Sequence, residues 1–436
     1  MDCREPGTSR PSTAIGNSCS RDPRAYAALA FRDSGLGGTL RRGREVHQSF
    51  DEVIPRENTD CVKYDDRLNR FGRRDLLPMW VADMDFRTPA CVREALQRVV
   101  DHGVYGYHLK TEKYYRAIVD WWERRHQHAV DPASIFFSPG VVPAVSHLVQ
   151  ALTTKGDGII VQPPVYFPFF WAIQVNGRRM LQNQLREHRG EYSIDYEDLE
   201  RKAREARMLI LCSPHNPVGR VWRREELERV ADICLRHGVI ILSDEIHNDL
   251  VFRPVRHVPT ASLSPDVDRI TVTCHSASKT FNLAGLSTAY VVIKGPDLRQ
   301  AFKQGSEPLH VEALNTFGLR AMEAAFTQGE PWLDALLEYL EGNYRLVRDD
   351  CAEHLPRVRP SPLEGTYLVW LDFRSYGFSP QELKDCIIQK ARLGLNDGPT
   401  FGPGGHGFQR MNIACPRQVV RQALDQLKAA LGSGER

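Results

Sequence analysis

The sequence predicts an α/β protein built on a mostly parallel sheet that helices cover on both faces. Short apolar strands alternate with helical patterns from residue 135 to a strand that begins at residue 289. These strands are continuous apolar runs, as expected where both faces of a sheet are buried. Polar and small residues follow the strands, at the edge where such sheets bind ligands.

The first elements precede this alternation. Order is expected to begin near Phe50, and an apolar run at residues 76–86 is closed by two carboxylates. A helix is predicted to start after Pro89 and to stop at Gly103, because proline suits the first turn and glycine suits the end of a helix. A glycine-hinged aromatic turn then leads into a second amphipathic helix through residues 115–122.

The central region contains the strands of the predicted sheet and the helices between them. Strands are expected at residues 135–137, 158–161, 208–212, 239–242 and 270–274, and from residue 289. Helices are expected after Gly140, after the capping residue Asp195, and over residues 225–237 with Gly238 as the stop.

After about residue 329 the pattern changes to a smaller α+β domain. A long helix at 332–350 is followed by strands at 365–371 and 408–414 and by helices at 381–391 and 419–431. We therefore predict a large domain at 86–330, a small C-terminal domain at 331–436, and a segment at 48–85 that packs with the small domain. Residues 1–47 lack periodic apolar positions and are predicted to be a disordered extension.

Composition narrows the functional class. The chain has 436 residues, a net charge of +2 and 42% hydrophobic residues, so neither a nucleic acid nor a membrane surface is an expected partner. No apolar run approaches the length that spans a bilayer. The ten cysteines are scattered without Cys-x-x-Cys spacing, which favours reduced thiols in the cytoplasm over disulfides or a zinc site.

The principal candidate for a catalytic residue lies in the stretch at residues 276–286. Lys279 lies just past a predicted strand, between hydroxyl and small side chains. Burial lowers the pKa of a lysine, and the neutral amine can form a Schiff base with an aldehyde cofactor or act as a base. Ser276 and Ser278 can donate hydrogen bonds to a phosphate. Taken alone, Ser-x-Ser-Lys is a short pattern, and a surface lysine is its ordinary interpretation.

Three further strand-end residues could serve a heteroaromatic cofactor. Asp244, buried beside a ring nitrogen, would keep that nitrogen protonated. Asn216 offers an amide to a phenolate oxygen and a carboxylate, and Tyr166 offers a flat face for a ring.

Two groups could hold anions. Gly140 opens a helix, so the backbone amides of Val141 and Val142 can bind a phosphate at its N terminus. Arg410 can clamp a carboxylate. Together with Lys279, these are the parts that a pyridoxal phosphate enzyme needs.

Each residue also has an ordinary interpretation when it is considered alone. Asp244 could cap a turn, Asn216 could be a turn residue before a proline, and Tyr166 could be part of the core. His247 could be structural or could lie near the cofactor, and we expect no metal site because matching ligands are lacking. Arg410 could lie on the surface. Their joint occurrence in this order favours one common site.

These residues lie in motifs that resemble fold-type I aminotransferase-like enzymes. The resemblance runs from about residue 50 to the end and is most similar to the cystathionine β-lyase subgroup named after MalY and PatB, the cysteine-S-conjugate β-lyases. The motifs are MWVADMDF (79–86), HGVYGY (102–107), SPHNPVGR (213–220), SDEIH (243–247), SKTFNLAGL (278–286) and NIACPR (412–417).

The resemblance implies the fold, the cofactor and the assembly. It implies the fold-type I pyridoxal phosphate-dependent transferase fold and pyridoxal 5'-phosphate as cofactor. It also implies a homodimer in which Tyr107 of a neighbouring subunit completes the phosphate site.

Three positions depart from common family patterns. His247 stands where aminotransferases usually have tyrosine, and the usual phosphate-binding arginine is replaced near Ser287. Both departures are typical of the β-lyase subgroup. Tyr64 stands where that subgroup commonly has tryptophan, which is expected to affect packing and not chemistry.

The implied activity is carbon–sulfur β-lysis of cystathionine or related cysteine S-conjugates to a thiol, pyruvate and ammonia. The resemblance assigns Lys279, Asp244 and Asn216 to catalysis, His247 to the cofactor, and Arg410 with Asn216 to the substrate carboxylate. An aminotransferase of class I/II is the main alternative. A regulatory protein that keeps this fold is less favoured, because the set of catalytic residues is intact.

Overall fold

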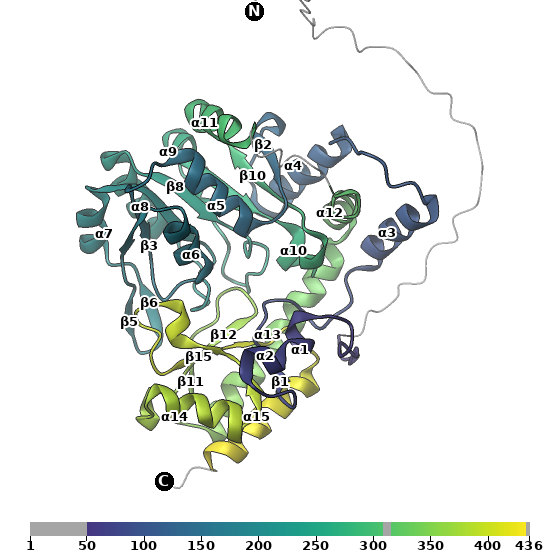
Figure 1. The fold of residues 1–436 in the computed structure, drawn as a ribbon, viewed down its shortest axis with the longest axis vertical. Helices are drawn as coiled ribbons and strands as arrows, with labels where there is room; N and C mark the ends of the chain where they lie inside the picture. Colours follow the sequence, from purple (N-terminus) through teal and green to yellow (C-terminus); the bar gives the residue numbers. More distant parts are fainter. Residues whose placement is uncertain (1–49, 308–314, 433–436) are drawn as a thin grey trace, which may run out of the picture. The chain divides into compact units, whose positions relative to one another are not determined.

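The computed structural model describes residues 50–307 and 315–432, so the predicted extension at 1–47 lies outside the described residues. Its main feature is a seven-stranded sheet (Figure 1). The strand order is β2 (Ile135–Ser138), β10 (Ala289–Ile293), β9 (Thr271–His275), β8 (Ile240–Asp244), β7 (Ala206–Cys212), β3 (Gly158–Val161) and β4 (Arg179–Gln182). Neighbours from β9 to β4 run parallel, and β10 is antiparallel to both β9 and β2. The predicted mostly parallel sheet is confirmed.

Alternate residues of the central strands enter two different cores. In β7, Met208 and Ile210 pack on one side of the sheet, whereas Leu209 and Leu211 pack on the other. Helices α5 (Val141–Leu152), α6 (Pro168–Val175) and α11 (Pro296–Ser306) contribute to the first core. Helices α7 (Tyr196–Ala203), α8 (Arg224–His237) and α9 (Pro265–Ile270) contribute to the second. Burial on both faces explains why these strands are continuous apolar runs.

The predicted helix ends agree with the structure. Helix α3 (Ala90–His102) stops at Gly103, which has φ 71° and donates its backbone N–H to the Val99 carbonyl. Helix α8 stops in the same way at Gly238, with φ 63°. These left-handed conformations favour glycine. Asp195 caps α7 by accepting a hydrogen bond from the Asp198 amide at 3.1 Å.

A third core holds the remaining long helices. Besides α3, these are α4 (Glu112–His126), α12 (Thr316–Gln328), α13 (Glu330–His354) and α15 (Arg417–Leu431). Among the elements not predicted from the sequence are the helices α6, α9, α11 and α12, the edge strand β4, and the hairpin of β5 (Arg186–His188) and β6 (Glu191–Ser193). Phe302 is the only residue of helix α11 that is buried.

The C-terminal region contains a four-stranded antiparallel sheet with the order β11 (Arg359–Pro360), β12 (Leu368–Asp372), β15 (Phe408–Asn412) and β14 (Asn396–Asp397). The helix predicted at 381–391 is α14 (Pro380–Asp385), continued by a π-helical turn at Cys386–Lys390.

The segment before α3 joins this C-terminal region. It contains α1 (Val62–Asp65), α2 (Arg67–Phe71) and β1 (Leu77–Pro78), and β1 pairs in parallel with β13 (Leu393–Gly394) (Figure 1). The domain boundaries predicted at residues 86 and 331 stay predictions. In the described part of the chain, no helix has the length and apolarity needed to cross a bilayer.

Candidate active site

A cavity of about 220 Å³ lies at the carboxyl ends of the central strands. Ten of the residues singled out from the sequence line it: Gly140, Val141, Val142, Tyr166, Asn216, Asp244, His247, Ser276, Ser278 and Lys279. They come together because parallel strands end at the same edge of a sheet. Of the other two candidates, Arg410 contacts Asn216, and Tyr107 is fully exposed on the surface of the single chain.

Lys279 lies in α10 (Ala277–Thr280), a one-turn helix that directly follows β9. Its side chain is partly buried and lines the cavity. Its Nζ atom donates a hydrogen bond to the backbone carbonyl of Ala82 at 2.6 Å. Burial lowers the pKa of Lys279 to about 8, while Asp83 opposes this change and Arg410 adds to it. The neutral amine is therefore accessible near neutral pH.

Asp244 ends β8 and is buried. Its Oδ1 atom accepts a hydrogen bond from the Ile246 amide at 3.2 Å. Burial raises the pKa of Asp244 to about 7, only partly opposed by that amide and by Lys279. Among the described residues Asp244 forms no ion pair, so its carboxyl group is suited to face a protonated ring nitrogen.

Arg410 comes from β15 and is also buried. Its Nη1 atom donates to Asn216 Oδ1 at 2.9 Å, and its Nη2 atom donates to the Trp80 carbonyl at 2.9 Å and to Asn396 Oδ1 at 2.6 Å. Its Nε atom has no hydrogen-bond partner. Burial lowers the pKa of Arg410 to about 10, and no carboxylate of the described residues forms an ion pair with it. A buried guanidinium without an acid is suited to bind a substrate carboxylate.

One group of the lining residues can hold a phosphate. Helix α5 begins at Val141, with Gly140 as its N-cap, and its first residues line the cavity, so their backbone amides can donate to an anion there. Ser276 is already engaged: its hydroxyl donates to the Thr288 carbonyl at 2.7 Å and accepts from the Ser278 amide at 3.0 Å. The Thr288 hydroxyl is buried without a partner and lines the cavity, so it is an available donor that the sequence analysis missed.

His247 and Tyr367 stand near Lys279. The Nδ1 atom of His247 is buried without a partner, and its ring centre lies 6.0 Å from that of Tyr367. Burial, with Lys279 and Arg410, lowers the pKa of His247 well below its usual value, so the imidazole stays neutral. The Tyr367 hydroxyl donates to the Ala82 carbonyl at 2.9 Å, beside Lys279. Tyr367 lies in a predicted strand, and nothing in its neighbours indicated a role in the site.

Three comparisons place the chain among known proteins. The profile of the family described as aminotransferase class I and II matches residues 74–427. Cystathionine β-lyase PatB of Bacillus subtilis is 44% identical over 385 residues, covering 88% of this chain and 100% of PatB. Protein MalY of Escherichia coli is 35% identical over 388 residues, covering 88% and 98%. The crystal structure of cystalysin from Treponema denticola, which contains pyridoxal 5'-phosphate, matches with a TM-score of 0.85 and 36% identity, covering 88% and 98%.

Proposed function

The chain belongs to the aminotransferase class I and II family, and from this premise we propose that it is a pyridoxal 5'-phosphate-dependent carbon–sulfur β-lyase. Its substrates are cystathionine or related cysteine S-conjugates, which react with water to give a thiol, pyruvate and ammonia. One observation supports this assignment above the others: Lys279 and Asp244 line the same cavity, in a chain that covers the whole length of the cystathionine β-lyase PatB.

The residues of the cavity fit this cofactor. Lys279 offers an amine to the aldehyde, and Asp244, with its raised pKa, offers a carboxyl group to the pyridine nitrogen. The amides of Val141 and Val142, with the hydroxyls of Ser278 and Thr288, offer donors to the phosphate. Tyr166 and His247 also line the cavity and would offer flat faces to the ring.

When bound, pyridoxal 5'-phosphate withdraws electrons from the substrate Cα and makes its proton acidic. The neutral amine of Lys279 takes up that proton, while the Ala82 carbonyl holds the amine in place. Asp244 keeps a proton on the ring nitrogen. Arg410 and Asn216 bind the substrate carboxylate and thereby orient Cα toward Lys279. Loss of the Cα proton allows the thiolate to leave from Cβ.

The decisive experiment measures pyruvate from cystathionine with no keto acid added. A β-lyase releases pyruvate together with an equal amount of thiol. An aminotransferase requires a keto acid to turn over, so pyruvate that appears only after a keto acid is added would refute the lyase assignment.

A homodimer belongs to the same proposal. Val104, Tyr105, Tyr107 and Leu109 expose large apolar side chains close together in the sequence. Such a concentration is typical of an interface. In a dimer Tyr107 would approach the phosphate end of the partner's cavity, and light scattering of the purified protein tests the assembly.

Cytoplasmic location also remains part of the proposal. The eight cysteines in the described residues are free thiols, as is usual for proteins of a reducing compartment. No cluster of three or more possible metal ligands occurs in the part of the chain that the structure describes.

A further inference from the structure

The backbone at residues 80–84 accepts hydrogen bonds from both basic side chains of the site, Arg410 and Lys279. The Trp80 carbonyl accepts from Arg410, and the Ala82 carbonyl accepts from Lys279. Asn412 donates to the two carbonyls at 81 and 83, each at 2.6 Å. The position of this segment therefore sets the position of the Lys279 amine.

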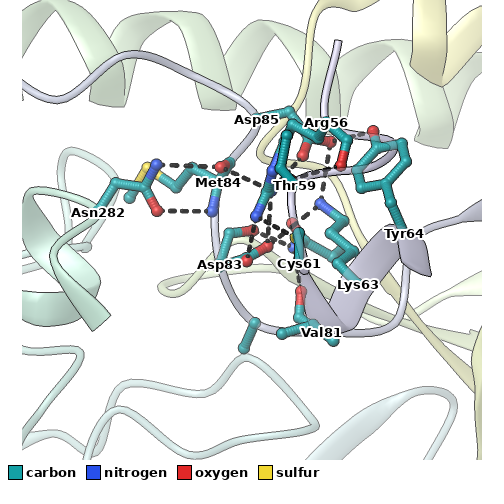
Figure 2. Close-up of polar contacts among 12 residues, drawn as sticks. Arg56, Thr59, Cys61, Lys63, Tyr64, Val81, Asp83, Met84, Asp85 and Asn282 are labelled. Carbon is teal, nitrogen blue, oxygen red and sulfur yellow. Dashed lines mark hydrogen bonds and ion pairs between the residues drawn. The ribbon is translucent and has the colours of Figure 1, made fainter. Parts of the chain in front are cut away.

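A partly buried charge cluster, in which Lys63 and Asp85 are the buried members, flanks the same segment (Figure 2). Arg56 bonds Asp83 at 2.7 Å and Asp85 at 2.6 Å. Lys63 Nζ lies 2.9 Å from Asp85 and 3.6 Å from Asp83. Two cations thus balance two carboxylates. Lys63 is only 1% exposed, so water cannot replace its charge if the side chain is removed.

Two contacts tie this cluster to the lysine stretch. Asn282, three residues after Lys279, accepts from the Met84 amide at 3.0 Å and donates to the Met84 carbonyl at 3.0 Å (Figure 2). Arg56 donates to that same carbonyl at 3.2 Å. Asp83, moreover, is the residue that directly follows the carbonyl to which Lys279 is bonded.

We infer that Lys63 is a positioning residue for the reaction: together with Arg56 it occupies the carboxylates of Asp83 and Asp85, so that Lys279 bonds a neutral backbone carbonyl and not a carboxylate. This role rests on the proposed function of Lys279 as the reactive amine. Tyr64 takes part as well, because its hydroxyl lies 3.2 Å from Asp85 Oδ2. The replacement of tryptophan at this position therefore adds a polar contact to the packing change expected from the sequence.

The charged and titratable groups around Lys279 determine the direction of the effect. Asp83 and Asp244 favour its ammonium form, and Arg410 disfavours it. Asp83 in turn faces Arg56 and Lys63 as well as Lys279. Asp85 faces Arg56, Lys63, Tyr64 and, through the electrostatic field, Cys415.

Removing the Lys63 charge leaves a net negative cluster beside Lys279. A nearby carboxylate favours the protonated amine, so the pKa of Lys279 should rise. Removing the Asp83 charge should have the opposite effect. The double change removes one charge of each sign and should return the pKa toward its original value.

The test uses the full-length chain with the cofactor removed by hydroxylamine. Labelling of Lys279 by a small acylating reagent is followed against pH by mass spectrometry, because only the neutral amine reacts. We expect Lys63→Met to raise the midpoint pH of Lys279 labelling by about one unit, so that labelling at pH 7 becomes about tenfold slower. We expect Asp83→Asn to lower it and Lys63→Met/Asp83→Asn to lie near the wild type.

Arg67→Met is the matched control. It removes one positive charge from the same segment. Arg67 donates to the Tyr64 carbonyl, but its ion pair is with the exposed Glu57 and not with Asp83 or Asp85. Its labelling midpoint should stay unchanged. In the holoenzyme, the amine of Lys279 is free only after substrate has bound, so the acidic limb of the pH profile of kcat should shift in the same order as the midpoints.

Two outcomes would overturn the inference: Lys63→Met and Arg67→Met having equal effects, or Asp83→Asn raising the midpoint. Asp83→Asn keeps the test decisive even if Lys63→Met does not fold. The labelling does not depend on which reaction the holoenzyme catalyses. A failure of pyruvate release would therefore refute the proposed function and leave this test intact.

Discussion

The structure predicts that Asp244→Asn makes the cofactor-free protein more stable while it impairs catalysis. Asp244 is buried, and burial raises the pKa of its carboxyl from 3.8 to about 7. Below pH 3.8 the carboxyl is neutral in both the folded and the unfolded chain. As the pH rises from 3.8 to 7, the unfolded chain loses the proton first, so ionisation favours unfolding. Asparagine has no such dependence and can still accept the hydrogen bond from the Ile246 amide.

The size of the stability difference follows from the interval between the two pKa values of Asp244, 3.8 in the unfolded chain and about 7 in the folded chain. One pKa unit corresponds to about 1.4 kcal/mol, so a window of roughly three units costs the wild type about 4 kcal/mol above pH 7. At pH 5, about one unit above the unfolded pKa, ionisation lowers the free energy of unfolding of the wild type by only about 2 kcal/mol. The advantage of Asp244→Asn in free energy of unfolding should therefore grow by about 2 kcal/mol between pH 5 and pH 8.

The assay is urea unfolding of the cofactor-free full-length chain, followed by circular dichroism at several pH values. The exposed Asp120→Asn is the control and should change the free energy of unfolding by less than about 0.5 kcal/mol at every pH. With cofactor added, kcat of Asp244→Asn should fall by about two to three orders of magnitude, since the amide cannot hold the ring-nitrogen proton by charge. An Asp244→Asn protein no more stable than wild type at pH 8 would refute the argument.

Three further predictions concern the substrate, the cofactor and the assembly. Arg410→Lys should lower kcat/KM by at least about a hundredfold, mainly through KM. Three of the five guanidinium N–H groups of Arg410 already donate within the protein, and a lysine has only three N–H groups in total. The exposed Arg374→Lys is the control, and a loss in kcat/KM of less than about tenfold in Arg410→Lys would contradict the carboxylate role. Lys279→Ala should abolish the visible absorption band that the cofactor gains on linkage to the enzyme, together with pyruvate release, and an unchanged spectrum would rule out Lys279 as the attachment point. If each site takes Tyr107 from the partner, a one-to-one mixture of Lys279→Ala and Tyr107→Ala subunits should regain up to about a quarter of the wild-type activity after dissociation and reassembly; no regain beyond the sum of the two variants would show that each subunit works alone.

Much of the site was predictable because its residues lie at the ends of strands. Asn216, Asp244 and Lys279 follow three different apolar runs, and parallel strands bring such positions to one edge without any knowledge of the side-chain packing. The motifs supplied the cofactor and the family, and the comparisons confirmed both.

The contacts that cross between distant segments were not predictable in this way. Lys279 bonds the Ala82 carbonyl, 197 positions earlier in the chain, and the Tyr367 hydroxyl reaches the same atom. Backbone carbonyls have no sequence signature, since every residue carries one. The free hydroxyl of Thr288 was missed for a related reason: a buried threonine beside a strand is usually part of the core.

The sequence by itself determined the sheet and the lysine and acid that line one cavity, because hydrophobic periodicity and strand ends are local properties. Only the tertiary structure decided that Lys63 and Arg56 neutralise Asp83 and Asp85 beside that amine. A lysine in a short polar helix is normally solvated. Its burial becomes favourable only when folding brings two carboxylates from another segment within bonding distance, and such long-range charge balance cannot be inferred from residue order.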